Sequence, residues 1–127
     1  MAEKYKINPK LTPEQKQILF ENGTEPPFEN KYWDNHEEGI YYCANDHNPV
    51  FSSEAKYDSG TGWPSFWEPI NPDAIDYEED DTFGTHRTAV ICATCHGHLG
   101  HVFNDEPEPT GLRYCLNSGA LEFEEKN

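Results

Sequence analysis

The four cysteines of the chain are its most reactive side chains, and their spacing divides them into two groups. Cys92 and Cys95 are separated by two residues at the predicted end of a strand, a turn that lets both sulfur atoms converge on one tetrahedral metal ion. Cys43 and Asp46 have the same spacing, with a carboxylate in place of the second thiolate. Since zinc accepts carboxylate oxygen, the spacing is compatible with a structural zinc site of three cysteine ligands and one aspartate ligand.

The residues around these cysteines leave other kinds of site open. His47 and His96 directly follow the two pairs and are rival candidates for the fourth metal ligand. Without a metal, Cys92 and Cys95 could form a dithiol that cycles with a disulfide, or they could be plain buried thiols. A metal or redox role is favoured over a secreted disulfide framework because no apolar segment resembles a signal peptide.

Cys115 stands apart from the other cysteines and has polar neighbours at alternate positions. If this segment is a strand, Arg113 and Cys115 point to the same side and Asn117 can follow them. The positive charge of Arg113 would then favour the thiolate form of Cys115, and the Asn117 amide could donate a hydrogen bond. The alternative is that the three are ordinary residues of a half-buried strand.

Two further segments offer groups that could work beside such a thiolate. His98 and His101 could act as acid and base near neutral pH, although histidine pairs are often structural or metal-binding. Residues 60–66, Gly-Thr-Gly-Trp-Pro-Ser-Phe, form a loop in which glycine permits close backbone approach and proline fixes the turn. Trp63 could wall a small apolar pocket there, or Trp63 and Phe66 could be core residues under a turn.

Taken together, these segments resemble the type B methionine sulfoxide reductases. The resemblance rests on three motifs in the family's order: residues 57–66 (Tyr-Asp-Ser-Gly-Thr-Gly-Trp-Pro-Ser-Phe), 98–103 (His-Leu-Gly-His-Val-Phe) and 109–118 (Pro-Thr-Gly-Leu-Arg-Tyr-Cys-Leu-Asn-Ser). Looser similarity extends it over nearly the whole chain, through residues 11–14, 23–25 and 32–36. Three independent motifs argue against a chance match.

The resemblance implies an enzyme that reduces the R epimer of methionine sulfoxide, free or within oxidised proteins, to methionine. Cys115 would be the nucleophile that attacks the sulfoxide sulfur and becomes a sulfenic acid. His98 and His101 would bind and protonate the sulfoxide oxygen, directly or through water. The resemblance also implies supporting roles: Asn117 orients substrate or water, Arg113 favours the thiolate, Trp63 holds the methyl group, and Phe66 belongs to the substrate-binding set.

Two residues depart from the family pattern and change the implied mechanism. Many members carry a resolving cysteine where this chain has Thr61. We therefore predict a one-cysteine cycle in which thioredoxin, glutathione or another external thiol reduces the sulfenic acid. The competing route uses Cys43, Cys92 or Cys95 as the resolving thiol. Asp46 stands where zinc-binding members have cysteine, so the zinc expected here has one aspartate ligand.

The elements that position these residues are expected to be short and mostly β. The chain has 127 residues and a mass of 14.6 kDa, which fits a single domain over residues 1–127 with one core. Only 35% of the residues are hydrophobic while 13% are aromatic, so aromatic rings must build the core, and 10 Pro and 9 Gly predict many turns. We therefore expect a mainly β fold, with an antiparallel, hairpin-rich sheet or open barrel-like core and a short N-terminal helix, and the resemblance implies two antiparallel sheets.

Local signals place these elements along the chain. Residues 1–36 are expected to form a helix and an extended arm that pack on the β core. The helix has Thr12 as N-cap, a capping box completed by Gln15, and a stop at Gly23, and the pair Tyr32-Trp33 can anchor the arm. Six strands are predicted, each bounded by Gly, Pro, Asn or Asp: Gly39–Cys43, Ala74–Glu78, His86–Cys92, His98–Phe103, Leu112–Leu116 and Ala120–Phe123.

The charge of the chain limits its partners. With 24 acidic against 9 basic residues the formal net charge is −15, which argues against nucleic acid and anionic membranes because both attract clustered Lys and Arg. The acidic run at residues 78–81 is expected to be an exposed loop or strand end. The polar start and the lack of a long apolar run predict a cytoplasmic location, and we expect a monomer.

Two other functions compete with the reductase. One is a non-catalytic, zinc-stabilised β module whose acidic surface binds a basic partner. The other is an oxidoreductase that uses Cys92 and Cys95 on substrates other than sulfoxides. Neither accounts for the presence of Trp63, His98 and Cys115 in motifs that follow the family's order.

Overall fold

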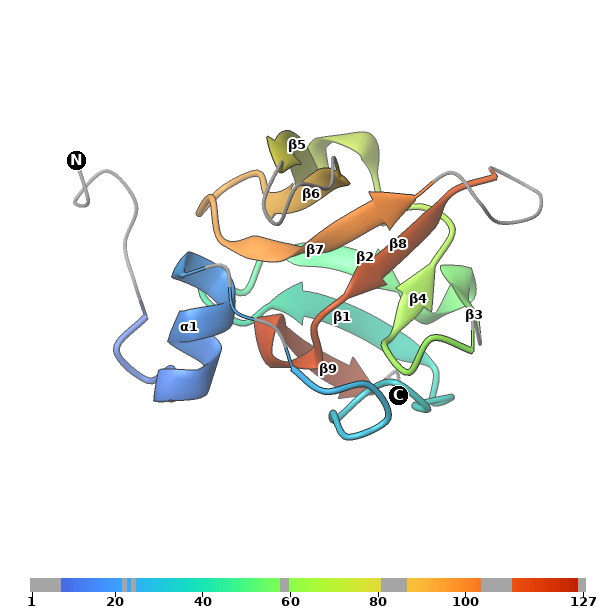
Figure 1. Ribbon diagram of the computed structural model, residues 1–127. Helices are drawn as coiled ribbons and strands as arrows, with labels where there is room; N and C mark the ends of the chain where they lie inside the picture. The colour runs from blue at the N-terminus through green and yellow to red at the C-terminus, as the bar shows by residue number, and fades with distance from the viewer. Residues whose placement is uncertain are drawn as a thin grey trace.

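The fold consists of two antiparallel sheets and a short helix (Figure 1). The computed structural model describes residues 8–21, 23, 25–57, 60–80, 87–103 and 111–125. One sheet has the strand order β2-β1-β9, from β1 (Gly39–Cys43), β2 (Pro49–Ser52) and β9 (Leu121–Glu125). The other has the order β3-β4-β8-β7-β6-β5, from β3 (Lys56–Tyr57), β4 (Ser65–Phe66), β5 (Ile75–Asp80), β6 (Arg87–Cys92), β7 (His98–Phe103) and β8 (Arg113–Leu116). The predicted mainly β class with two antiparallel sheets is confirmed, and neither sheet closes into a barrel over these residues.

The helix α1 (Pro13–Phe20) begins as its sequence predicts. The Thr12 hydroxyl accepts a hydrogen bond from the Gln15 backbone N–H at 3.1 Å, and the Gln15 side chain accepts one from the Thr12 N–H at 2.9 Å. The helix ends at Phe20, and the N–H of Gly23 then donates to the Gln17 carbonyl at 2.9 Å. No helix in the described part of the chain is long and apolar enough to cross a membrane.

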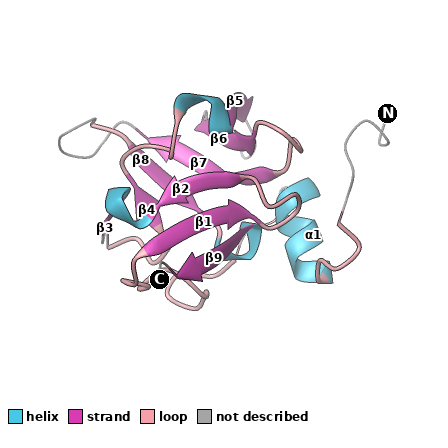
Figure 2. Ribbon diagram, turned by 180° about the vertical axis from the view of Figure 1, so that it is seen from behind, coloured by secondary structure: helices cyan, strands magenta, loops and turns pink. Residues whose placement is uncertain are grey.

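Aromatic rings from both sheets form the core between them. The rings of Tyr41 on β1 and Phe66 on β4 have centroids 5.2 Å apart, and those of Phe51 on β2 and Phe66 are 4.7 Å apart. Tyr114 on β8 lies 5.6 Å from Phe51. Strands β7 and β8 face the viewer in Figure 1 and β1 and β2 do so in Figure 2, so the two sheets lie against each other with these rings between them. The aromatic core predicted from composition is therefore present.

The arm that follows the helix is tied to the end of the chain. Tyr32 is buried, its N–H donates to the Ser118 hydroxyl at 2.9 Å, and its own hydroxyl accepts from the Phe123 N–H at 3.1 Å. Trp33 instead meets the ring of Phe28 edge to face at 4.9 Å. The arm thus brings residues 25–36 beside the last strand and the short 3-10 turn η5 (Ser118–Ala120).

The strand predictions are right for the longer strands and miss the shortest. Strands β1 and β7 have the predicted limits, and β8 begins one residue later than predicted. Strands β5 and β9 each begin one residue later and end two residues later than predicted. Three short strands, β2, β3 and β4, were not predicted, because pairing with a neighbour rather than their own sequence defines strands of two to four residues. The acidic residues 78–80 end the edge strand β5, as expected, and His86 and Asp81 lie outside the described residues.

Candidate active site

Strands β7 and β8 bring the predicted reactive residues to one face of the larger sheet. In the antiparallel register His101 lies opposite Cys115, and Phe103 lies opposite Arg113. Side chains alternate along a strand, so these four share one face while Tyr114 and Leu116 turn into the core. A cavity of about 670 Å³ opens on this face, and it is lined by six of the predicted site residues: Trp63, His98, His101, Arg113, Cys115 and Asn117.

A bulge in β7 explains how two histidines three positions apart reach the same face. In a regular strand an odd spacing would place them on opposite faces. Here Val90 pairs with Gly100 and Ile91 with His98, so Leu99 is an extra residue in β7. Leu99 is fully buried in the core, and the rings of His98 and His101 meet in the cavity with centroids 5.1 Å apart.

Cys115 is partly exposed at the cavity wall, in contrast to the other three cysteines, which are buried. Its Sγ lies 4.0 Å from the hydroxyl of Thr61. The Arg113 guanidinium sits 4.4 Å from the centroid of the Phe103 ring, a cation–π contact that fixes its charge on this face. Asn117 is 6% exposed, and its N–H donates to the Leu99 carbonyl at 2.9 Å. The one-faced array predicted from alternate positions is therefore formed.

His98 is a buried polar side chain of the cavity wall. It is 8% exposed, and within the described part of the chain neither of its ring nitrogens has a hydrogen-bond partner of ordinary geometry. Burial and the neighbouring His101 together lower the pKa of His98 to about 4, against the opposing effect of the Asp80 charge. His98 is therefore neutral at physiological pH, with polar atoms facing a cavity that a ligand oxygen could fill.

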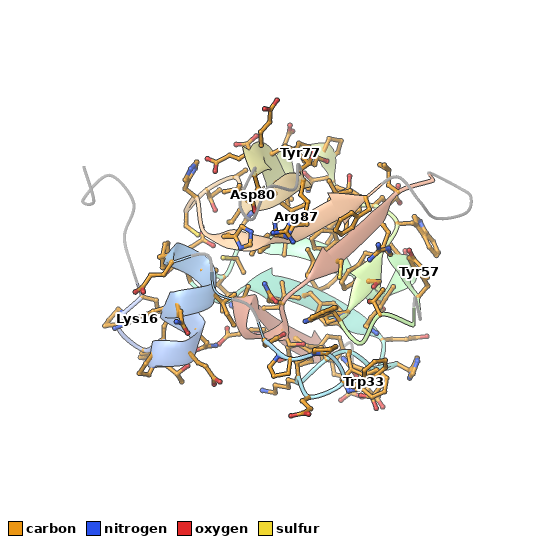
Figure 3. All side chains as sticks on the ribbon, viewed as in Figure 1. Lys16, Trp33, Tyr57, Tyr77, Asp80 and Arg87 are labelled. Carbon is orange, nitrogen blue, oxygen red and sulfur yellow. The ribbon has the colours of Figure 1, made fainter. Side chains whose placement is uncertain are left out.

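Asp80 and Arg87 complete the polar wall of the cavity, and the sequence did not single them out as site residues. The Asp80 carboxylate lies 2.8 Å from His101 Nε2 and 3.6 Å from the Arg87 guanidinium (Figure 3). Burial lowers the pKa of His101, and its hydrogen bond to Asp80 acts in the opposite direction. Asp80 belongs to the acidic run that looked like a solvated strand end, so only the pairing of β5 with β6 reveals its position.

Trp63 and Phe66, from one loop, point in different directions. The Trp63 indole N–H donates to the Glu25 carbonyl at 2.9 Å, which holds the ring at the cavity wall. Phe66 pairs with Tyr114 on β8, and its side chain is 0% exposed among the core rings. Sequence similarity placed Phe66 with the substrate-binding residues, but the alternation of side chains along β4 turns it away from the cavity and into the core.

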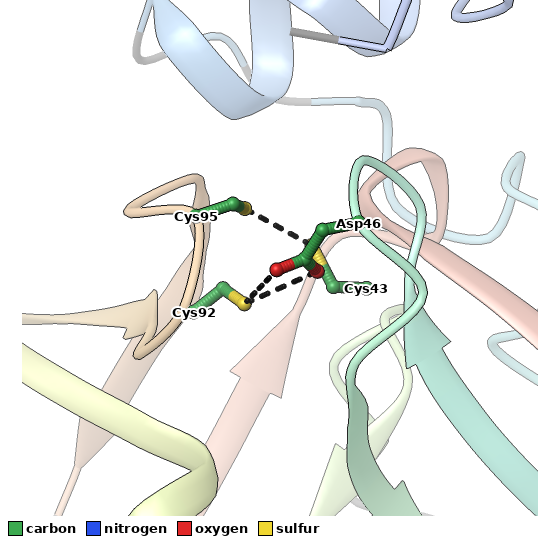
Figure 4. A group of neighbouring side chains, drawn as sticks. All are labelled: Cys43, Asp46, Cys92 and Cys95. Carbon is green, nitrogen blue, oxygen red and sulfur yellow. Dashed lines mark hydrogen bonds between the residues drawn. The ribbon is translucent and has the colours of Figure 1, made fainter. Parts of the chain in front are cut away.

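The remaining cysteines form a second group, where two hairpin loops meet (Figure 4). Cys43 ends β1 and Asp46 follows in the loop to β2, whereas Cys92 ends β6 and Cys95 follows in the loop to β7. One ligand atom from each of the four residues lies within 4.8 Å of the others. The Sγ atoms of Cys43 and Cys95 are 3.5 Å apart, and Cys92 Sγ is 3.6 Å from Asp46 Oδ1.

The two loops share one backbone pattern. The N–H of Cys43 donates to the Asn48 carbonyl at 2.8 Å, as the N–H of Cys92 donates to the Gly97 carbonyl at 2.9 Å. His47 and His96 each donate an N–H to the carbonyl of the first cysteine in their loop and have positive φ values of 63° and 66°. The loop with Cys43 and Asp46 therefore has the same backbone shape as the loop with Cys92 and Cys95, and each loop supplies two of the four candidate ligand atoms.

The two histidines do not point at this group. The His47 ring stacks on Tyr42 at 4.2 Å and its Nε2 lies 3.0 Å from Glu124. His96 Nε2 lies 2.7 Å from Glu78. Among the described residues the candidate ligands are therefore the three cysteines and Asp46. His47 and His96, the rival candidates for the fourth ligand, do not belong to this group.

The donor set of the cluster fits a soft divalent cation. Thiol hydrogen bonds from Cys43 and Cys95 lower the pKa of Cys92, and the same contacts with Cys92 and Cys95 raise the pKa of Cys43. The protons of the neighbouring thiols thus stabilise the Cys92 thiolate. In a metal site a bound cation would stabilise the thiolates in place of these protons. Three sulfur atoms and one carboxylate oxygen are a set that zinc accepts, so this cluster could hold a metal ion.

Comparison with known proteins identifies the family. The SelR domain model matches residues 11–125. The chain is 55% identical over 117 residues to the "Peptide methionine sulfoxide reductase MsrB" of Thiobacillus denitrificans, which covers 92% of this chain and 89% of that protein. It is 54% identical over 114 residues to the protein of the same name from Agrobacterium fabrum, covering 90% of this chain and 84% of that one. The chain therefore belongs to the SelR family, the type B methionine sulfoxide reductases.

Proposed function

We propose that this chain reduces the R epimer of methionine sulfoxide in oxidised proteins, with Cys115 as the nucleophile. The family makes it an oxidoreductase that acts on methionine sulfoxide. The observation that carries the proposal is the cavity in which a partly exposed thiol, two histidines, an amide and an indole lie on one face. A thiol reductase of sulfoxides needs a nucleophile, a proton donor and an apolar wall, and this cavity holds all three.

The reaction transfers one oxygen atom and two electrons. The Cys115 thiolate attacks the sulfoxide sulfur and forms an S–S bond while the sulfoxide oxygen takes a proton. The S–O bond of the sulfoxide then breaks, the hydroxyl oxygen bonds to the Cys115 sulfur, and the S–S bond breaks with its electron pair going to the methionine sulfur. Methionine leaves with its sulfur reduced, and Cys115 leaves the step as a sulfenic acid, oxidised by two electrons. Trp63 provides the apolar surface for the methyl group, which fixes the methyl and the oxygen on defined sides of the sulfur and so selects one epimer.

The two histidines take different roles because their surroundings differ. His98 is neutral at physiological pH, with its pKa lowered to about 4, so it serves as a hydrogen-bonding group for the sulfoxide oxygen. His101 is the proton carrier: burial lowers its pKa, but its hydrogen bond to Asp80 opposes this by stabilising the charged ring. Asp80 acts through His101 and is a positioning residue, as is Arg87 beside it.

The sulfenic acid is reduced by an external thiol such as thioredoxin. Thr61 occupies the position beside Cys115 where a resolving thiol would lie, at 4.0 Å from the sulfur. The three other thiols belong to the metal-binding group between the hairpin loops rather than to the cavity. None of the four cysteines forms a disulfide with another described residue, which suits a reducing compartment such as the cytoplasm.

Zinc is the metal that we assign to the cluster of Cys43, Asp46, Cys92 and Cys95. When bound, it would supply a cross-link between the two sheets and take no part in the redox chemistry. Asp46 is held for this role by an N–H from Asn48 at 3.1 Å and by the hydroxyl of Thr94. Such a buried cross-link would compensate for the thin core of a small domain.

The test is dithiothreitol-driven reduction of the separate R and S sulfoxides of N-acetylmethionine amide by the wild-type protein and by Cys115→Ser. We expect turnover of the R epimer alone and its loss in the variant. Reduction of both epimers would contradict the assigned selectivity. Failure to reduce either epimer, by a folded protein loaded with zinc, would favour the non-catalytic binding module instead.

A further inference from the structure

A second, aromatic hollow adjoins the cavity that contains Cys115. It has a volume of about 360 Å³, and its walls include the rings of Phe28, Trp33 and Trp63, with Asp34 and His36 at the exposed side. Residues of the arm and of the loop 60–63 thus form a surface on which three large rings converge. The mechanism proposed above uses only Trp63 of these rings.

Phe28 is held in this hollow although its side chain is not buried. It is 53% exposed, one of two large hydrophobic side chains described as exposed, and it has a positive φ of 63°. Its N–H donates to the Gly62 carbonyl at 2.8 Å, and Asn30 donates to the same carbonyl at 2.8 Å and to the Pro26 carbonyl at 2.9 Å. The backbone therefore fixes an exposed ring in an unfavourable conformation, which core packing does not require.

Gly62 shows how closely the two segments meet. It has a φ of 92°, and a Cβ atom added there would lie 2.7 Å from the Phe28 ring and 2.8 Å from the Phe28 backbone nitrogen. Only glycine allows the Trp63 loop and the Phe28 turn to approach this far. The hollow is thus rigid in its shape, and a ligand would pay little ordering entropy to bind there.

Trp63 makes the hollow continuous with the catalytic cavity, because it lines both. The relatives of this chain are named for peptide substrates. A methionine sulfoxide inserted into the cavity within a polypeptide would leave neighbouring residues at the cavity rim, and Trp63 is part of that rim. The hollow lies where a neighbouring side chain of the substrate would pass.

We propose that the hollow of Phe28, Trp33 and Trp63 is a subsite that binds a large apolar side chain next to the oxidised methionine of a protein substrate. The inference rests on the proposed function and specifies its substrate class. Aromatic walls favour an apolar side chain through burial of its surface, and the edge-to-face pair of Phe28 and Trp33 forms two of these walls. The enzyme would accordingly prefer oxidised segments that are normally part of a hydrophobic core.

The experiment measures kcat/KM for N-acetylmethionine-R-sulfoxide amide and for peptides that carry the R sulfoxide beside Leu, Ala or Lys on either side. The wild-type protein is compared with Phe28→Ala, Phe28→Leu and, as a matched exposed aromatic outside the hollow, Tyr77→Ala, whose side chain is 51% exposed on β5. We expect a preference for the Leu peptide over the Ala peptide of about fivefold. Phe28→Ala should abolish that preference and leave the blocked amino acid unchanged, Phe28→Leu should retain part of it, and Tyr77→Ala should retain all of it.

Three results would overturn the subsite. They are equal rates for the Leu and Ala peptides in the wild type, a preference for Lys over Leu, and an equal loss on all substrates in Phe28→Ala, which would indicate a merely structural role. The proposed function fails in a different way, since the blocked amino acid itself would then not be reduced by the wild-type protein.

Discussion

Two regions of the molecule use the same side chain for opposite purposes. Cys115 is partly exposed, next to a cavity, with Arg113 and two histidines on its face. Cys43, Cys92 and Cys95 are buried together between two hairpin loops, with Asp46 as their charged neighbour. A single exposed sulfur near cationic and acidic groups can react with a substrate, whereas several converging sulfurs hold a metal or protons. Burial and the number of sulfur neighbours, rather than residue type, thus separate reactivity from stability.

The largest effect should come from replacing the exposed sulfur. Cys115→Ser should lower kcat/KM for the R sulfoxide by about a thousandfold or more, because a hydroxyl is a far weaker nucleophile toward sulfur. The melting temperature should stay unchanged, since this side chain is not part of the core. Residual activity near the wild-type level would mean that a buried thiol does the chemistry and that the contrast between the two regions is false.

The reciprocal substitution should damage stability instead. Cys95→Ser removes one ligand from the cluster, and we expect loss of bound zinc and a fall of about 3 kcal/mol in the free energy of unfolding. Metal analysis and urea unfolding with and without a chelator measure both. Cys115→Ser is the matched control, since it makes the same atomic change in the other region. A chelator that leaves the wild-type unfolding curve unmoved would rule out a structural zinc.

The buried histidine of the cavity should make stability depend on pH. The folded pKa of His98 is about 4 against an ordinary value of 6.5, so between these values the unfolded chain binds a proton that the folded chain does not. The contribution of neutral His98 to the free energy of unfolding is fully present above pH 6.5 and is lost as the pH falls toward 4. Over that pH interval the free energy of unfolding, measured in urea, should fall by about 2 to 3 kcal/mol more in the wild type than in His98→Asn. Parallel losses in the two proteins would contradict the low pKa.

Replacing Asp80 should change the pH dependence of kcat/KM more than it changes substrate binding. The proton carrier His101 must be charged, so activity falls as the pH rises above its pKa, and the Asp80 hydrogen bond raises that pKa. Asp80→Asn should lower kcat/KM about tenfold at neutral pH and move the alkaline limb to lower pH. Asp76→Asn, on the same strand and exposed, is the control. An unshifted limb would show that Asp80 only supports the wall.

The smallest effect concerns the fate of the sulfenic acid. Thr61→Cys puts a second sulfur beside Cys115, and turnover with dithiothreitol should change by less than about threefold. After one turnover without reductant, the variant should lose two hydrogen atoms as a disulfide, while the wild type gains one oxygen atom. Intact mass spectrometry distinguishes these products. A disulfide in the wild-type protein would instead favour the competing route through a cysteine of the buried group.

Local signals in the sequence predicted part of this arrangement and long-range pairing decided the rest. The capping box of α1, the limits of β1 and β7, and the common face of Arg113 and Cys115 follow from spacing alone. The places of Asp80 and Phe66 do not, because they depend on which strand pairs with β5 and on the phase of a two-residue strand. The cluster of Cys43, Asp46, Cys92 and Cys95 is an intermediate case. Its residues could be identified from the sequence, but only the geometry of both loops excluded His47 and His96 as ligands.

The bulge at Leu99 determines which changes of length β7 can tolerate. An in-frame deletion of that codon would restore a regular ladder and leave His98 and His101 two positions apart, still on one face but with no leucine for the core beneath them. An added codon between the histidines would send one of them into the core wherever the bulge at Leu99 persists, because the rest of the ladder then separates them by an odd number of positions. Point substitutions in this segment can therefore be compensated by repacking, whereas insertions cannot, and libraries that vary loop and strand lengths should leave residues 98–101 fixed.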